Sequence, residues 1–377
     1  MPYSQNPKPD RGAVVSLVGG LLTIVLLVLW FAPLRSEPLT VTFTRGTVTL
    51  EDAAGNRSEV RPGQEIGKGQ RVVVPETGGA TLRLPDGHTV TIGDSSSVGV
   101  LRNDATLRGT GHSIELELGP GRVRVTGDGA PGTSLDLSTP TGVAGVRGTA
   151  LVAEVRGGDA LFSLHQGAVS VRPAEGPDAT LSPGLGAVVG AAGASVLPLP
   201  ATPEVLAPAT GTLVSDSTTV LVWRPVEGAV AYSVEYARDA AFQEVLRRLL
   251  VAGDTTAAVP VLEEDLPAFV RVAAVSAEGL EGVPSVERVL HVRLRFARGQ
   301  ALQQAGQMEE SIPEFQAALP NYATDPRLLK DLAWSLYTVS RFDDARARYE
   351  QALAVAPGDH EAHLELGRVL FWLEEYE

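Results

Sequence analysis

The sequence predicts a multidomain protein that is mainly β and has an α-helical C-terminus. Residues 39–190 and 212–292 contain short stretches in which apolar and polar side chains alternate between turns, as in strands with one buried face. From residue 293 the apolar residues recur with a helical period instead. The 40 Gly and 26 Pro, together with only 5% aromatic residues, agree with a turn-rich β protein.

An uncharged run of 23 residues, 12–34, comes before these segments. A helix of that length is about 34 Å long and would cross the hydrocarbon core of a bilayer. Lys8 and Arg11 precede the run and are opposed only by Asp10, so the positive-inside rule predicts a cytoplasmic stub, residues 1–11. We therefore expect a single-pass protein of the inner (cytoplasmic) membrane, with its bulk in the periplasm.

A cleaved signal peptide is the alternative interpretation of this run. Its apolar region is normally about 7–15 residues long and ends in a small-x-small site. Here the run is longer and ends in Trp-Phe-Ala-Pro-Leu, with no Ala-x-Ala site after it. The sequence thus favours an uncleaved anchor, and a periplasmic form that lacks residues 1–34 would contradict it.

The composition and motifs argue against catalysis. The chain has no Cys, so it has no disulfide or thiolate metal site, and its net charge of −14 argues against nucleic-acid binding. Residues 127–132 match the dinucleotide-binding spacing, but a strand is predicted at 134–137 where that motif needs a helix. His360 and His363 lack a third ligand at a suitable spacing. We expect no enzyme activity, no cofactor and no metal.

Two hairpins are predicted in the first β segment. Residues 81–84 and 89–92 flank an Asp-Gly turn, which tolerates positive φ. Residues 114–118 and 122–125 flank a Gly-Pro-Gly turn in the same way. In both cases charged or hydroxyl side chains alternate with apolar ones, so each strand should have one face in the core and one in water.

A segment at 138–149, Ser-Thr-Pro-Thr-Gly-Val-Ala-Gly-Val-Arg-Gly-Thr, precedes a predicted strand at 150–155. This segment resembles the signature of the FecR family, the extracytoplasmic domain of iron-dicitrate-type transmembrane regulators. The resemblance covers about residues 45–172. Its other motifs are Gly46-Thr47-Val48, Arg61-Pro62-Gly63, Leu84-Pro85-Asp86-Gly87-His88 and Gly167-Ala168-Val169-Ser170-Val171. It implies a curled, solenoid-like β domain, residues 39–190, and implies no active site.

The most characteristic part of this signature is the turn Val146, Arg147, Gly148 and Thr149. One interpretation is a tight strand turn that glycine makes feasible and in which the arginine forms a structural hydrogen bond. The other is a ligand site. We favour the first, because glycine at such positions usually serves the backbone geometry.

The next two segments are a linker and a second β unit. Residues 191–211 are rich in Ala and Pro and predict a semi-rigid extended linker. In residues 212–292, Trp223 lies on a predicted strand that is followed by a Tyr-x-Val strand and an Arg-Val-x-Ala-Val strand. This outline resembles fibronectin type III or related immunoglobulin-like modules. It implies a β-sandwich with Trp223 in its core.

A repeat of 34 residues fills the C-terminal part, residues 293–377. Gly299, Ala333 and Gly367 are spaced by 34, and the pairs Leu302 and Leu336, Phe315 and Tyr349, and Ala318 and Ala352 share that spacing. This pattern resembles tetratricopeptide repeats, which form an α-solenoid. Pro357 should end the second helix of the second repeat. Because the third copy reaches only its first helix, we expect further repeats or, less favoured, an end that packs on a partner.

The repeats suggest a protein or peptide partner. The first helix of each pair lines the concave face of a tetratricopeptide array, which predicts a groove formed by Arg327, Lys330, Trp334 and Tyr337. A cationic and aromatic stripe suits an acidic or C-terminal peptide. The alternative is that Trp334 and Tyr337 only contact the neighbouring repeat.

Three functions remain open. The favoured one is a membrane-anchored extracytoplasmic scaffold or adaptor for protein–protein interactions in the bacterial envelope. The second is a FecR-like sensor and transducer. Regulators of that family carry a cytoplasmic domain that handles a sigma factor, so a stub of residues 1–11 would need a separate membrane partner. The third is binding to a cell-wall glycan or an outer-membrane component, against which the low aromatic content counts.

Overall fold

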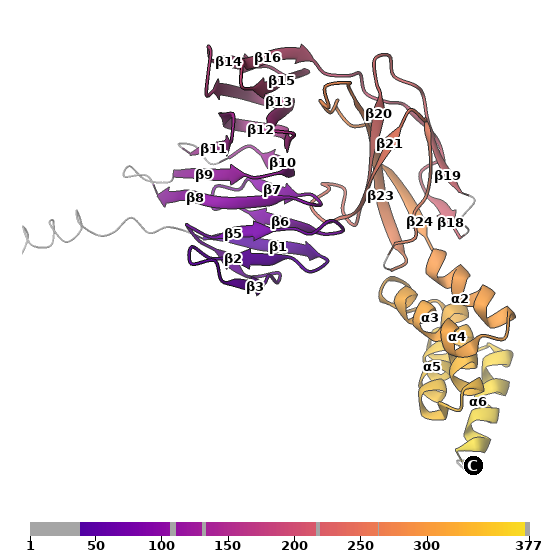
Figure 1. Ribbon diagram of the computed structural model, residues 1–377. Helices are drawn as coiled ribbons and strands as arrows, with labels where there is room; N and C mark the ends of the chain where they lie inside the picture. The colour runs from indigo at the N-terminus through magenta and orange to yellow at the C-terminus, as the bar shows by residue number, and fades with distance from the viewer. Residues whose placement is uncertain (1–37, 106–110, 130–132, 216–218, 263, 374–377) are drawn as a thin grey trace, which may run out of the picture.

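The computed structural model describes residues 38–105, 111–129, 133–215, 219–262 and 264–373 (Figure 1). The predicted stub, residues 1–11, and the predicted anchor, residues 12–34, lie outside these ranges. Within them, no helix is both long and apolar enough to cross a membrane. The described chain forms a curled β domain, then a second β unit, and ends in helices α2 to α6, so it is mainly β with an α-helical end.

One 16-stranded sheet forms the first domain. Its strands are β1 (Leu39–Arg45), β2 (Thr49–Glu51), β3 (Arg57–Glu59), β4 (Glu65–Ile66), β5 (Arg71–Val73), β6 (Gly79–Arg83), β7 (Thr89–Ile92), β8 (Ser97–Ala105), β9 (His112–Leu118), β10 (Gly121–Gly127), β11 (Ser134–Thr139), β12 (Gly142–Arg156), β13 (Asp159–Pro173), β14 (Ala179–Leu181), β15 (Leu185–Gly190) and β16 (Gly193–Pro198). In Figure 1 they stack from β3 at one end to β14 and β16 at the other.

The sheet folds over on itself at the long strand β12. The first half of β12 pairs with β11, from Gly142 to Val146, and its second half pairs with β10, from Thr149 to Val155. The path β2-β5-β8-β9-β11 therefore forms one layer and β1-β6-β7-β10 forms the other. This is the curled β architecture that the sequence implied.

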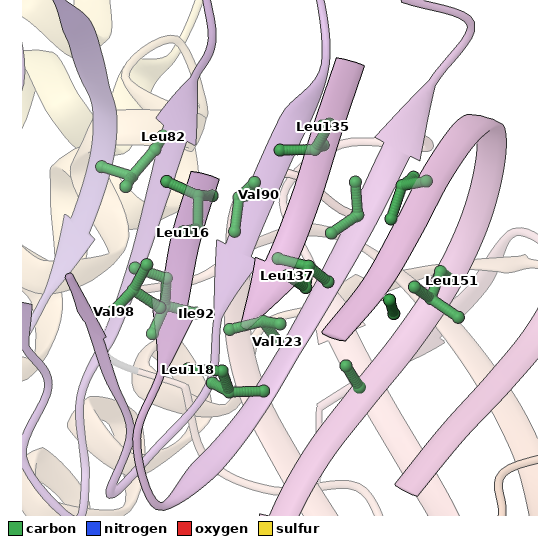
Figure 2. Packing of buried hydrophobic residues seen from close by; sticks show 14 of the residues in the cluster. Leu82, Val90, Ile92, Val98, Leu116, Leu118, Val123, Leu135, Leu137 and Leu151 are labelled. Atoms are coloured by element: carbon green, nitrogen blue, oxygen red, sulfur yellow. The ribbon is translucent and has the colours of Figure 1, made fainter. Parts of the chain in front are cut away.

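The core of this domain lies between the two layers. Figure 2 shows apolar side chains from β6, β7 and β10 directed toward those of β8, β9 and β11. Leu82, Ile92, Leu116, Leu137 and Leu151 are each at most 1% exposed. Each strand contributes alternate residues to this core, as a period of two dictates.

The two predicted hairpins have different outcomes. Strands β6 and β7 pair antiparallel, with Leu82 opposite Val90, so the first hairpin is confirmed. The second hairpin prediction is wrong, because β9 and β10 do not pair with each other. Strand β9 pairs with β8 and, in parallel, with β11, whereas β10 pairs with β7 and β12. The Gly-Pro-Gly segment thus carries the chain from one layer to the other.

The second β unit consists of two packed sheets. Its strands are β17 (Val205–Ala207), β18 (Thr212–Val214), β19 (Val220–Trp223), β20 (Ala231–Ala237), β21 (Val245–Ala252), β22 (Thr256–Ala258), β23 (Leu266–Val275) and β24 (Arg288–Val292). The sheets have the orders β17-β19-β22 and β18-β24-β23-β20-β21. Trp223, 1% exposed, packs 5.3 Å from the ring of Tyr232 on the facing sheet, as predicted for a core residue. Strands β16 and β17 occupy part of the predicted linker, residues 191–211, so the extended connection is shorter than expected.

The helices are α2 (Leu294–Gln304), α3 (Met308–Tyr322), α4 (Pro326–Thr338), α5 (Phe342–Val355) and α6 (His360–Trp372). They form two helical hairpins and the first helix of a third, which is the predicted repeat pattern. A Cβ atom on Gly299 would lie 2.6 Å from the Phe315 ring, so α2 and α3 need a glycine there. Helix α5 ends at Val355, two residues before Pro357.

The residue that precedes β23, Asp265, holds the start of the helical array. The carboxylate of Asp265 accepts hydrogen bonds from the backbone N–H groups of Arg295 (2.8 Å) and Phe296 (2.9 Å) in the first turn of α2. The backbone carbonyl of Asp265 also accepts a bond from Asn321 on α3. The helices are thus attached to the second β unit by a capping interaction across the domain boundary.

Candidate functional site

The four predicted groove residues all lie on α4, the first helix of the second repeat, but they do not share one surface. Lys330 and Trp334 line a depression of about 280 Å³ between α4 and α6. Tyr337 lines a separate, shallow depression with Phe371. Arg327 is exposed, and its guanidinium lies 5.8 Å from the ring centre of Phe296 on α2.

Lys330 does not present a free positive charge in this depression. Its Nζ atom lies 2.9 Å from Asp359 Oδ2 and 2.7 Å from Glu361 Oε2, both at the start of α6. Asp359 also accepts the N–H groups of Glu361 and Ala362, so it caps α6. The lysine therefore ties α4 to α6, and the expected cationic stripe is neutralised at this residue.

Carboxylates dominate the charge of the same depression. Asp331, Glu361 and Glu365 line it together with Trp334 and Tyr349. Burial raises the pKa of Asp331, although a hydrogen bond from Gln300 (2.8 Å) opposes this shift. Glu365 accepts a hydrogen bond from Arg368 at 2.8 Å through Oε1, whereas its Oε2 atom is buried and has no hydrogen-bond partner in the described part of the chain. A buried carboxylate oxygen without a donor favours a ligand that supplies one.

The aromatic side chains lie at the edge of the depression. The Trp334 and Tyr337 rings are 5.7 Å apart, and Trp372 Nε1 donates to the Tyr337 hydroxyl at 3.0 Å. Trp372 also stacks on Phe342 with an angle of 4° between the planes. Tyr337 therefore does contact the neighbouring repeat, as the alternative interpretation held. Trp334 keeps a half-buried face toward the depression.

The FecR signature turn occupies the corner of β12, where the strand passes from one layer to the other. Gly148 has φ +54°, and a Cβ atom on the facing Gly167 would lie 2.1 Å from the Gly148 carbonyl oxygen. Val146 and Thr149 are buried on either side of the corner. These contacts support the structural interpretation of the two glycines. The Arg147 side chain is exposed and makes no hydrogen bond to any other described residue, so the expected structural hydrogen bond from this arginine is absent there.

A cluster of buried charges joins the curled β domain to the second β unit, and sequence reasoning missed it. Arg122 and Arg124 on β10 were assigned to the wetted face of an alternating strand, yet their side chains are only 9% and 7% exposed. Their partners are Glu235 on β20 and Glu281, and Glu281 lies at least 157 residues further along the chain. The predicted alternation of apolar and charged side chains along β10 is thus correct. Its charged face, however, is covered by the second β unit and not by water.

Glu281 makes the most contacts in this cluster. Its carboxylate accepts two hydrogen bonds from Arg122, at 2.8 Å each, and one from Arg124 at 3.2 Å. Its backbone N–H donates to Ser163 (2.9 Å), and its carbonyl lies 2.9 Å from His165 Nε2, both on β13. Burial would raise the pKa of Glu281, but the neighbouring arginines lower it to about 2. Glu281 therefore stays ionised and links the second β unit to the curled β domain.

Acidic and imidazole groups do not cluster elsewhere in a way that suits a metal. In the ranges that the structure describes, no three His, Asp or Glu side chains are placed to hold one ion. His363 lies on the surface, with Nε2 3.0 Å from the Pro357 carbonyl oxygen.

The described chain is assembled from three modules: a curled β domain, a two-sheet unit and paired helices. Comparison with protein families identifies two of these modules. Residues 70–170 match the family described as FecR protein, and residues 272–326 and 330–377 match a tetratricopeptide repeat family. The chain thus carries a FecR domain and tetratricopeptide repeats. The repeat match begins within β23, whereas the first described helix begins at Leu294.

The comparison with curated proteins gave no match. Among solved structures, a candidate anti-sigma factor from Parabacteroides distasonis is 17% identical with a TM-score of 0.28, over 34% of this chain and 57% of that one. A cell surface anchoring domain is 27% identical with a TM-score of 0.16, over 17% of this chain and 83% of that one. A β-1,2-glucanase from P. distasonis is 16% identical with a TM-score of 0.18, over 49% of this chain and 28% of that one. This chain thus spans just over half of the anti-sigma structure.

Proposed function

We propose that this protein is a non-catalytic adaptor, held at the outer side of the cytoplasmic membrane by residues 12–34, and that its helical repeats bind a peptide segment of a partner protein. The FecR and tetratricopeptide families support a role in protein interaction or signal transduction. The observation that carries the adaptor proposal is the depression between α4 and α6, with Trp334 on one wall and carboxylates around it.

The charges of this depression favour a basic peptide over the acidic one that the sequence suggested. Lys330 is already paired with two carboxylates. Glu365 pairs with Arg368 through Oε1 only, and its buried Oε2 atom has no donor in the described part of the chain. A lysine or arginine side chain of the partner would donate to this oxygen and stack on Trp334. A carboxylate of the partner would face Asp331, Glu361 and Glu365 instead.

The experiment is a binding measurement on the full chain with two labelled peptides of equal length, one rich in Lys and Arg and one rich in Asp and Glu. We expect the basic peptide to bind more tightly and to lose affinity as salt rises. Glu365→Gln and Trp334→Ala should each weaken it at least about fivefold. Arg348→Gln on α5, whose guanidinium donates to Gln351, is the matched control and should leave the affinity unchanged. Tighter binding of the acidic peptide would overturn this choice of ligand.

A second candidate is a sensor that passes a signal to a separate membrane partner. The FecR match and the rigid connection of that domain to the second β unit through Glu281 favour it. Photo-cross-linking in intact cells from positions on α4 and within residues 12–34 separates the two. A partner captured only by α4 supports the adaptor, and an integral membrane protein captured by residues 12–34 supports the sensor. Recovery of a glycan fragment would favour cell-wall binding.

A further inference from the structure

The charges in the interface between the curled β domain and the second β unit do not balance. Glu235 lies 3.1 Å from Arg122, 3.2 Å from Arg124 and 2.8 Å from Arg271. Glu281 contacts Arg122 and Arg124 as well, and lies 3.7 Å from Arg248. Four guanidinium groups thus share two carboxylates, and both carboxylate side chains are 4% exposed.

The neighbouring ion pairs do not remove this excess. Arg45 pairs with Asp94 at 3.5 Å, so this pair adds as much positive as negative charge. Glu154 lies 3.6 Å from Arg156, which is 53% exposed, and it also interacts with Arg122 and Arg248, so it offsets part of the excess. With Glu154 counted beside Glu235 and Glu281, the four arginines still exceed the carboxylates by one positive charge, and their side chains are at most 21% exposed. Such an arrangement costs free energy unless a further negative group approaches.

A small cavity adjoins these groups. It has a volume of about 20 Å³ and is lined by Arg122, Arg124, Arg248 and Glu235 among others. This is just above the roughly 10–15 Å³ that one water molecule requires, so phosphate and carboxylate ligands are too large. The Nε–H group of Arg122, in a side chain that is 9% exposed, has no hydrogen-bond partner in the described part of the chain.

We propose that this cavity binds one halide-sized anion, such as chloride, between the two β units. The anion accepts a hydrogen bond from a guanidinium that is otherwise unsatisfied and offsets part of the excess positive charge. Because the cavity is lined by both units, through Arg122 on one side and Arg248 on the other, the anion stabilises their contact. The chloride concentration then sets how firmly the FecR domain is held.

The first test compares thermal unfolding of the full chain in sodium chloride and in sodium gluconate at equal ionic strength, so that screening is the same. Gluconate is too large for the cavity. We expect the unfolding temperature of the β units to rise by roughly 3–5 °C for each tenfold increase in chloride above its dissociation constant, and not in gluconate. Equal behaviour in both salts would overturn the proposal.

The second test uses variants and bromide. Arg248→Met removes one positive charge from the cavity and should reduce the response to chloride, whereas Arg172→Met, on an exposed ion pair of β13, should leave it unchanged. Crystals of the unaltered protein soaked in bromide should show an anomalous peak beside Arg122. This readout does not depend on whether a variant folds, and a cavity without such a peak would disprove the site.

Discussion

Single side chains decide how the two β units meet. Glu281, which follows β23, binds β13 through its backbone and β10 through its carboxylate, so one residue of the second β unit holds two strands of the curled β domain. His165 completes this contact, with Nε2 2.9 Å from the Glu281 carbonyl oxygen. Since a carbonyl oxygen only accepts hydrogen bonds, Nε2 must carry the proton, which fixes the neutral tautomer of the ring.

The pH dependence of stability follows from this histidine. Burial lowers the pKa of His165 below the unfolded value of 6.5. The charges of Arg122 and Arg124 lower this pKa further, whereas the hydrogen bond to Glu281 raises it by less than burial lowers it. Between the folded and the unfolded pKa of His165, the unfolded chain binds more protons than the folded one. The stabilisation that neutral His165 provides is therefore complete above about pH 6.5 and is lost as the pH falls. Glu281 adds a second loss of stability as the pH falls below 4.5, its unfolded pKa, because its pKa is lower in the folded protein.

We expect the free energy of unfolding of the β units, measured by denaturant titration, to fall as the pH decreases below 6.5. His165→Gln should flatten this part of the curve and leave the loss below pH 4.5 in place. His363→Gln, at an exposed histidine on α6, is the control. If the control flattens the curve as much as His165→Gln does, the assignment to His165 is wrong.

At the scale of the elements, strand β12 and helix α2 depend on residues from other parts of the chain. The corner in β12 needs the close approach of Gly148 and Gly167, because any Cβ atom at Gly167 would overlap the opposing carbonyl. Helix α2 receives no cap from its own N-terminal residue, Arg293, and is capped instead by Asp265, the residue that precedes β23. Both elements thus form fully only when their neighbours are in place.

Asp265→Ala tests the capping contact. Loss of both hydrogen bonds should cost about 1–2 kcal/mol of stability in the helical array and should increase hydrogen exchange at the amides of Arg295 and Phe296. Asp359→Ala removes the cap of α6 in the same way and serves as the matched variant. It should increase exchange in α6 alone. Unchanged exchange at the start of α2 in Asp265→Ala would contradict the role of this residue.

At the scale of the whole molecule, the ion cluster makes the curled β domain and the second β unit one body, with the helices attached at the far end of the second unit (Figure 1). Two further contacts join the same surfaces. Arg45 Nε donates to the Val245 carbonyl at 3.3 Å, and Thr81 Oγ1 donates to the Gln243 carbonyl. The interface is therefore polar and depends on matched charges.

Glu281→Gln should disrupt this arrangement. It leaves Arg122, Arg124 and Arg248 with one carboxylate fewer, and removal of one partner from a buried ion network costs roughly 3–5 kcal/mol. Small-angle X-ray scattering should show a larger radius of gyration, and protease should cleave between β16 and β17. Glu204→Gln breaks an exposed pair with Arg224 and should change stability by less than about 1 kcal/mol. A variant as compact and resistant as the unaltered protein would show that the interface does not depend on this charge.

Local patterns in the sequence were enough to predict several strands and the paired helices. A period of two identified those strands and the 34-residue period identified the helices, because the spacing of buried residues follows directly from the geometry of each element. The core position of Trp223 was implied by the resemblance to immunoglobulin-like modules. The curled sheet was implied by the FecR signature, and residues 70–170 match that family.

Only the tertiary structure decided which surfaces meet. The sequence could not show that β9 and β10 belong to different layers, that Arg122 lies under another domain, or that Lys330 is neutralised by α6. A strand with alternating charges has the same pattern whether water or a second domain covers its polar face. The cover comes from residues more than 100 positions away, and no local periodicity carries that information. The elements were therefore set by the sequence, whereas the pairing of β strands, the buried charges and the chemistry of both candidate sites were set by the tertiary contacts.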